Sequence, residues 1–248
     1  MDNKGSTLPI VFVHGLVGGL ADPECLEHLD AVQVISPDLQ GYGCNQQFQN
    51  ISIEGQALEL QRAIEQAGIN GAVNLVGHSV GGVIAAAFVQ QYPGRVKSLV
   101  FAEGNFTLVD AFWSARLAEM TSQEAAASHQ ESVQHPEAWL AQAGVLVTAG
   151  RLRKAREALA YQPAATRQAT ARAVVEYTRR PEYQVLLKEV FDRVEVHLVA
   201  GERSRADWDV PAWALQRAKS YAEIADTGHL LMLEAPEEFA GAINAAFQ

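Results

Sequence analysis

Residues 72–82 read AVNLVGHSVGG, an apolar run that ends in a glycine-rich turn around Ser79. The run 72–76 predicts a buried strand, and the apolar segment 83–92, which stops at a Pro-Gly pair, predicts a helix. Glycines two positions before and two positions after Ser79 have no Cβ, so they relieve crowding in so sharp a turn. The pattern therefore predicts a serine hydroxyl held out at the carboxyl edge of a sheet, at a helix N-terminus that favours negative charge.

The sequence on both sides of this turn alternates between predicted strands and helices. Apolar runs predict strands at 8–14, 31–36, 96–102, 194–200 and 221–225, and the spacing of apolar residues predicts helices at 53–67, 211–218 and 236–247. Strands that are apolar throughout are typical of sheets covered on both faces, so we expect an α/β fold with a mostly parallel sheet and helices on both faces. Residues 108–189, which are rich in Ala, Gln, Glu and Arg, predict several inserted helices.

Two further segments carry groups that acyl transfer by a serine requires. A serine hydroxyl needs a base, and His229 follows the last predicted strand on a loop. The other histidines suit this role less well because they lie in the turn itself, within a strand, or on helices: His78, His197, His28, His129 and His135. A tetrahedral oxygen also needs two N–H donors. The backbone of Val80 can supply one, and that of Leu16, after His14-Gly15, the other.

Four motifs together resemble the α/β-hydrolase superfamily: HG at 14–15, DLQGYG at 38–43, GHSVGG at 77–82 and GH at 228–229. The order of serine and then a histidine near the end also matches the family. The resemblance implies Ser79 as nucleophile, His229 as base, and the N–H groups of Leu16 and Val80 as the oxyanion hole. It also implies a core of residues 1–107 and 191–248, with residues 108–190 as an inserted helical lid.

The acidic member of the triad is where the sequence departs from this family. The family usually places an aspartate three residues past a glycine after a late strand, and Ser204 occupies that position here. Glu103, which follows the strand predicted at 96–102, is our first choice because some family members take the acid from that strand. The later loop residues Asp207 and Asp209 are alternatives, and so is Glu202. The acid would fix the histidine tautomer and stabilise the imidazolium.

We therefore expect a serine hydrolase, carboxylesterase-like, that cleaves a small-molecule carboxylic ester or thioester through an acyl-enzyme without a cofactor or metal. A carbon–carbon bond hydrolase, an acyltransferase and a non-catalytic ligand-binding protein of the same fold are alternatives. The aromatic residues in and beside the helical insertion are interpreted as core, with a second possibility that they line an apolar cleft: Phe106, Phe112, Trp113, Trp139 and Tyr161.

Composition limits the classes of partner. The 248 residues are 48% hydrophobic and carry a formal net charge of −10, which suits a folded domain and argues against general binding to nucleic acid or to anionic membranes. No window approaches the roughly 18 consecutive apolar residues of a membrane span, and residues 1–9 lack the apolar segment of a signal peptide. We expect a cytoplasmic protein, and the sequence leaves its oligomeric state open.

Overall fold

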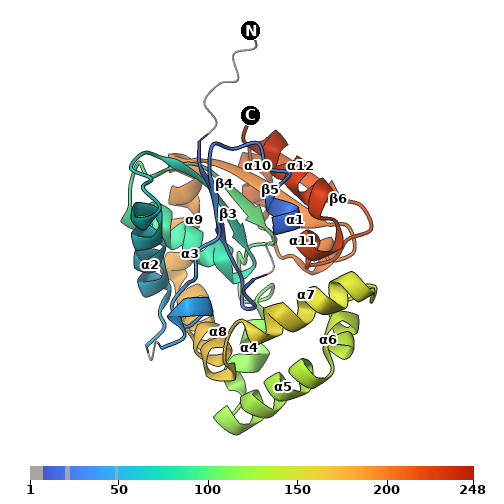
Figure 1. Cartoon of the computed structure of the whole chain (residues 1–248). Coiled ribbons are helices and arrows are strands. Elements are labelled where there is room, and N and C mark those ends of the chain that lie inside the picture. The colour runs from blue at the N-terminus through green and yellow to red at the C-terminus, as the bar shows by residue number, and fades with distance from the viewer. Residues whose placement is uncertain (1–7, 20–22, 48–49) are drawn as a thin grey trace.

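A computed structural model describes residues 8–19, 23–47 and 50–248. Its centre is a sheet whose strands are all parallel, in the order β2-β1-β3-β4-β5-β6 (Figure 1). The strands are β1 (Ile10–Val13), β2 (Val34–Ile35), β3 (Val73–His78), β4 (Val96–Ala102), β5 (Glu195–Gly201) and β6 (Ser220–Ile224). The predicted α/β class and parallel sheet are confirmed.

Helices cover both faces of the sheet, which explains why its central strands are mostly apolar and buried. Side chains alternate along β1, so Val11 and Val13 enter one apolar cluster while Ile10 and Phe12 enter the other. The first cluster contains residues of α2 (Ile53–Gln66), α3 (Val80–Gln91), α9 (Pro181–Arg193) and α10 (Ala212–Arg217). The second contains residues of α1 (Pro23–Leu26), α11 (Leu231–Glu234) and α12 (Pro236–Ala246).

The strand register brings the candidate residues to one edge of the sheet. Val13 of β1 pairs with Gly77 of β3, and His78 pairs with Ala102 of β4. The residues that follow these strand ends therefore emerge side by side. The carboxyl edge of a parallel sheet is where ligands of open α/β folds bind.

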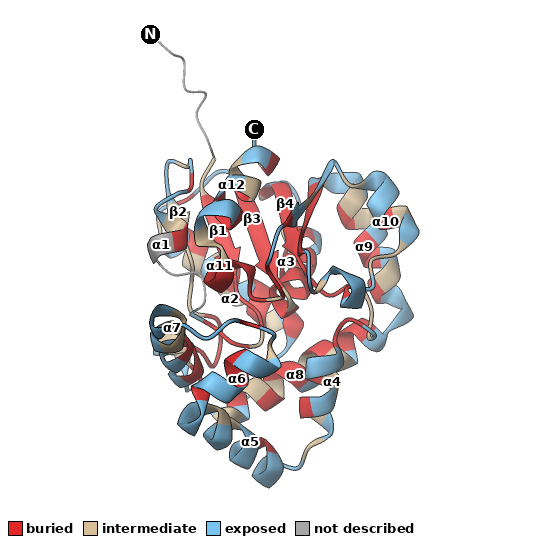
Figure 2. Cartoon of the chain, turned by 90° about the vertical axis from the view of Figure 1, so that its right-hand side faces the viewer, coloured by how far each residue is buried: buried red, intermediate tan, exposed pale blue. Residues whose placement is uncertain are grey.

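A block of helices connects β4 to β5; all but the last, α9, lie beyond this edge, whereas α9 packs beside α3 on one face of the sheet (Figure 1). Its members are α4 (Phe112–Glu119), α5 (Ser122–Gln134), α6 (Pro136–Gln142), α7 (Ala149–Ala160), α8 (Ala164–Arg179) and α9. Figure 2 shows that α5 is mostly exposed, whereas α8 carries several buried residues. Valines and tyrosines of α8 and α9 join the first apolar cluster, so this end of the block packs against the core.

Several boundaries differ from the sequence-based expectation. The strand predicted at 31–36 pairs over two residues only, and the strand predicted at 72–76 continues to His78, with α3 starting at Val80. Helix α11, directly after His229, was not predicted because a four-residue apolar turn has no helical period to detect. No helix in the described part of the chain has both the length and the apolar character needed to cross a membrane.

Candidate active site

Ser79 occupies the sharp turn between β3 and α3. Its backbone has φ 54° and ψ −123°, a conformation that is costly for a residue with a side chain. Two backbone hydrogen bonds hold Ser79 in this conformation. The Ser79 N–H donates to the carbonyl of Ala102 over 3.1 Å, and the Ser79 carbonyl accepts from the Gly82 N–H over 2.9 Å. The turn is thus fixed to the end of β4, and the half-buried hydroxyl faces a cavity.

Glycines on both sides of Ser79 are required by close packing. A Cβ at Gly81 would lie 2.0 Å from the carbonyl oxygen of Val13, and a Cβ at Gly77 would lie 2.8 Å from that of Gly81. The crowding expected from the sequence arises because α3 starts directly against the end of β1. Only glycine fits at this contact.

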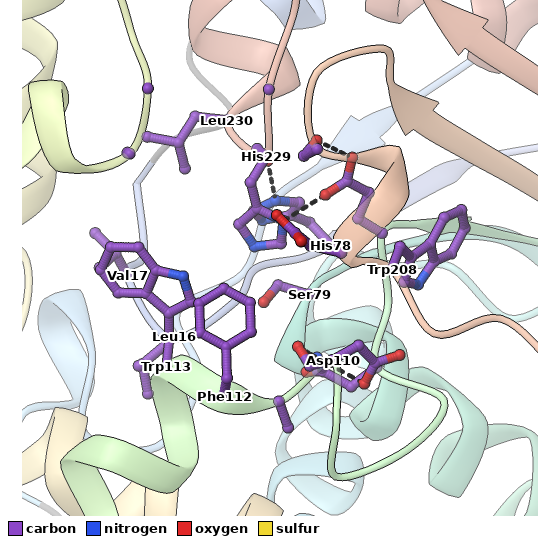
Figure 3. Close-up of a pocket in the computed structure, with 18 of the residues that line it drawn as sticks. Leu16, Val17, His78, Ser79, Asp110, Phe112, Trp113, Trp208, His229 and Leu230 are labelled. Atoms are coloured by element: carbon purple, nitrogen blue, oxygen red, sulfur yellow. Dashed lines mark hydrogen bonds and ion pairs between the residues drawn. The ribbon is translucent and has the colours of Figure 1, made fainter.

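His229, labelled in Figure 3, pairs with the buried Glu103 beside this turn, and its own side chain is 35% exposed. The His229 Nδ1–H donates to Glu103 Oε2 over 2.6 Å. The other carboxylate oxygen accepts the Gly201 N–H over 2.8 Å and a hydrogen bond from the Ser204 hydroxyl. Ser204, at the position where the family usually has its acid, therefore supports the carboxylate of Glu103.

These hydrogen bonds determine the charge of Glu103, whose exposed fraction is only 3%. Burial alone would raise the pKa of this carboxyl, but the hydrogen bonds from His229, Ser204 and Gly201 together hold the pKa below its ordinary value. An ionised Glu103 accepts a hydrogen bond from His229 Nδ1–H. The proton stays on Nδ1, and Nε2 of the same ring is therefore able to accept another proton.

His78 holds the His229 backbone from the opposite side. Its Nε2–H donates to the His229 carbonyl over 2.8 Å, and the two ring centroids are 4.8 Å apart. Burial, together with the charge of His229, lowers the pKa of His78 to about 3, so this ring stays neutral. His78 is therefore placed to position the loop of His229 rather than to exchange protons.

Ser79, His229 and Glu103 line one cavity of about 440 Å³ (Figure 3). In the described part of the chain the Ser79 hydroxyl makes no hydrogen bond to the His229 ring, and such contacts in ligand-free sites often tighten only when substrate binds. Much of the cavity wall is aromatic: Phe112, Trp113, Trp139 and Trp208. Of the aromatic residues singled out in the sequence, Phe106 lies in the core, and Tyr161 packs on the loop after β1.

The two candidate oxyanion donors flank Ser79. Val80 is the first residue of α3, so its N–H has no acceptor within the helix. Leu16 lines the cavity on the other side. The turn before Leu16 lies directly against the serine, because a Cβ on Gly15 would be 3.0 Å from the Cβ of Ser79.

The alternative acids do not contact His229. Asp209 accepts a hydrogen bond from the Thr107 hydroxyl over 2.7 Å, and Glu202 accepts the Asp226 N–H over 2.9 Å. Asp207 lines the cavity within a short 3₁₀ turn. In the described residues, none of the three forms a hydrogen bond or ion pair with His229.

Two ionisable groups in the cavity wall, Asp110 and Arg203, were not predicted from the sequence. Burial raises the pKa of Asp110 to about 7, although its carboxylate accepts the N–H groups of Phe106 and Thr107. Arg203 forms an ion pair with the buried Glu234 and donates to the carbonyl of Gly144 over 2.9 Å. No local pattern marks either residue, since each depends on segments that are distant or irregular.

Comparisons with known proteins identify the family and the fold. The sequence model of the alpha/beta hydrolase family matches residues 10–242. Lipase 3 of Moraxella sp. is 31% identical over 113 residues, which are 43% of this chain and 33% of the lipase. The 2-hydroxy-6-oxo-2,4-heptadienoate hydrolase of Pseudomonas putida is 32% identical over 110 residues, 40% of this chain and 38% of that enzyme. The chain thus aligns with little more than a third of these curated relatives.

Similarity to solved structures extends over the whole chain. A thermophilic esterase from Thermogutta terrifontis superposes with a TM-score of 0.73 at 24% identity, covering 98% of this chain and 92% of the esterase. At this level of identity the superposition establishes the fold and leaves the chemistry to be argued from the site.

Proposed function

The chain belongs to the alpha/beta hydrolase family, and on this premise we propose that it is a serine hydrolase that cleaves small carboxylic esters through an acyl-enzyme. One observation carries the proposal. A serine held in a strained turn shares a cavity with a histidine whose Nδ1–H is bound by a buried carboxylate. This combination supports the proposed roles of Ser79 as nucleophile, His229 as base and Glu103 as orienting acid.

The proposed reaction follows from the roles of these groups. His229 Nε2 accepts the Ser79 proton as the serine oxygen attacks the ester carbonyl carbon, and Glu103 stabilises the resulting imidazolium. The N–H groups of Leu16 and Val80 donate to the oxyanion that forms. His229 then gives its proton to the departing alkoxide. In a second half-reaction the same ring takes a proton from a water molecule, whose oxygen attacks the acyl carbon. The bond between this carbon and the Ser79 oxygen then breaks, the carboxylic acid leaves, and His229 returns the proton to Ser79.

The cavity supports an ester with an apolar acyl or alcohol part. Its aromatic side chains exclude water from the reacting carbonyl and offer contact area to apolar groups. Similarity to a lipase over 113 residues also favours an ester. We propose that the helical insertion, residues 108–190, acts as a lid over this cavity, because Phe112 and Trp113 of α4 line it while remaining 49% and 41% exposed.

A fluorophosphonate probe and a panel of 4-nitrophenyl esters of increasing chain length test the proposal. We expect the parent protein to be labelled at Ser79 and to turn over the esters, and the Ser79→Ala variant to do neither. A folded parent protein that neither reacts with the probe nor hydrolyses any ester of the panel would exclude the proposed chemistry.

Carbon–carbon bond hydrolysis is the second candidate, because a dienoate hydrolase aligns with this chain at 32% identity. The cavity favours the ester instead. A dienoate carries a carboxylate, and Arg203 is the only lysine or arginine among the described residues that line the cavity. Its guanidinium is already engaged by Glu234 and by backbone carbonyls. Assay of a 2-hydroxy-6-oxo-dienoate beside the ester panel separates the two, and faster turnover of the dienoate would favour the second candidate.

A further inference from the structure

A buried side-chain amide of the helical insertion is hydrogen-bonded to the loop that carries Leu16. Gln162 lies between α7 and α8, and its exposed fraction is 1%. Its Oε1 accepts the Gly18 N–H over 2.9 Å, across 144 residues of sequence. Its Nε2 donates to the carbonyl of Ala158 over 3.0 Å. The two ends of the amide therefore have different partners, which fixes Oε1 toward the loop.

A second connection reaches the same loop two residues earlier. The buried hydroxyl of Tyr42 donates to the Leu16 carbonyl over 3.2 Å and lies 3.1 Å from the hydroxyl oxygen of Thr170 in α8. The α7–α8 segment thus binds Gly18 directly and reaches the Leu16 carbonyl only through Tyr42 of the core. These two contacts flank Val17, which is 9% exposed and part of the cavity wall.

Packing limits the freedom of this loop further. A Cβ on Gly18 would lie 2.5 Å from the ring of Tyr161, the residue that precedes Gln162. The Tyr161 hydroxyl also hydrogen-bonds to Asp38 of the core. The loop after β1 is therefore held between the core and the α7–α8 segment.

We propose that Gln162 is a positioning residue, which sets the place of the Leu16 N–H relative to Ser79 through its hydrogen bond to Gly18. The inference rests on the proposed ester hydrolysis, in which Leu16 is an oxyanion donor. The chemical reason is that an oxyanion donor stabilises charge that exists only in the transition state. Displacement of the loop by about 1 Å therefore lowers kcat and leaves ground-state binding nearly unchanged.

The test replaces Gln162 by Met, which fills similar space but leaves the Gly18 N–H without its acceptor. We expect kcat for a 4-nitrophenyl ester to fall about ten- to a hundredfold with KM nearly constant. The Gln162→Glu variant keeps an acceptor for Gly18 and should recover most of the lost kcat.

A pair of inhibitors separates this role from a general structural one. A trifluoromethyl ketone adds the Ser79 oxygen to its carbonyl carbon, the proton passes to His229, and the ketone oxygen becomes an oxyanion. The ether of the same chain length forms no oxyanion. Gln162→Met should lower the affinity for the ketone by the same factor by which it lowers kcat/KM, and it should leave the affinity for the ether unchanged.

Gln168 provides a matched control, since it is another buried glutamine of the insertion, with an exposed fraction of 4%. Its Nε2 donates to the Met120 carbonyl over 2.6 Å, away from the loop after β1. Gln168→Met should lower thermal stability to a similar extent but keep the parent kcat and ketone affinity. If the parent hydrolyses esters and the two methionine variants have equal kcat, the positioning role is refuted. If the parent hydrolyses no ester at all, the proposed function itself has failed.

Discussion

Glu103 is the residue on which the proposed chemistry can be tested most directly, because its carboxylate contacts the base without touching the nucleophile. The Glu103→Gln variant keeps the shape of the side chain but loses the negative charge that the His229 Nδ1–H meets at 2.6 Å. We expect kcat to fall by roughly a hundredfold to ten-thousandfold, with residual turnover supplied by the oxyanion donors. Steady-state kinetics on the fastest ester of the panel measures the effect.

The alternative acids are the controls for this prediction. Asp209→Asn weakens a hydrogen bond to Thr107 and removes a charge near Asp110, and Asp207→Asn changes an exposed side chain of the cavity wall. Neither residue contacts His229, so each variant should change kcat by less than about fivefold. If Glu103→Gln keeps full activity and one of the aspartate variants loses most of its activity, that aspartate and not Glu103 is the acidic member of the triad.

His78 gives the stability of the protein a characteristic dependence on pH. The folded state keeps this ring neutral down to about pH 3, whereas an unfolded chain protonates histidine below about pH 6.5. Unfolding therefore takes up a proton between these values, and the stability supplied by the neutral ring falls as the pH falls.

The His78→Gln variant removes this titration while retaining an N–H that can donate to the His229 carbonyl. Between pH 7 and pH 4 its free energy of unfolding should decline by about 3 kcal/mol less than that of the parent. Urea unfolding at the two pH values provides the measurement, with His28→Gln as an exposed-site control. An equal decline in both proteins would show that His78 is protonated in the folded state.

At the scale of an element, the start of α3 depends on the absence of a side chain at Gly81. A methyl group there would overlap the Val13 carbonyl, so Gly81→Ala must push α3 away from β1 and distort the turn of Ser79. We expect a loss of about 3 kcal/mol in the free energy of unfolding together with loss of fluorophosphonate labelling. Gly241→Ala in α12, where nothing lies within 4 Å of the added Cβ, should be neutral or stabilising.

The sequence predicted those elements whose own residues form a recognisable pattern, such as an apolar run or a glycine-rich turn. The continuous apolar run of β1 and the glycines around Ser79 are visible in the sequence, and so is a glutamate that follows a strand. Short elements such as β2 and α11 offer too few residues for a period to be recognised. Other features depend on partners far away in the chain and leave no local signal. They are the support of Glu103 by Ser204, the neutral state of His78 and the contact of Gln162 with Gly18.

At the scale of the whole molecule, the helices between β4 and β5 differ in how firmly they are anchored. Helix α5 buries only Ala125, and its first turn is held locally by a capping box between Thr121 and Glu124. Helix α8 buries seven residues, among them Val174 and Tyr177 of the core cluster. Segments with few buried contacts open at a low free-energy cost, whereas core segments open only with the whole fold.

Hydrogen exchange should therefore divide the proposed lid into two parts. We expect amides of α5 to exchange through local opening, at least about a hundredfold faster than those of α8, and amides of α8 to exchange as slowly as those of β3 and β4. Mass spectrometry of peptides from the native protein provides the measurement. Such a division would let the outer helices admit substrate while the α7–α8 segment keeps Gln162 on the loop of Leu16. Equal protection of α5 and α8 would instead mean that the helices move as one body, and every opening would then also displace an oxyanion donor.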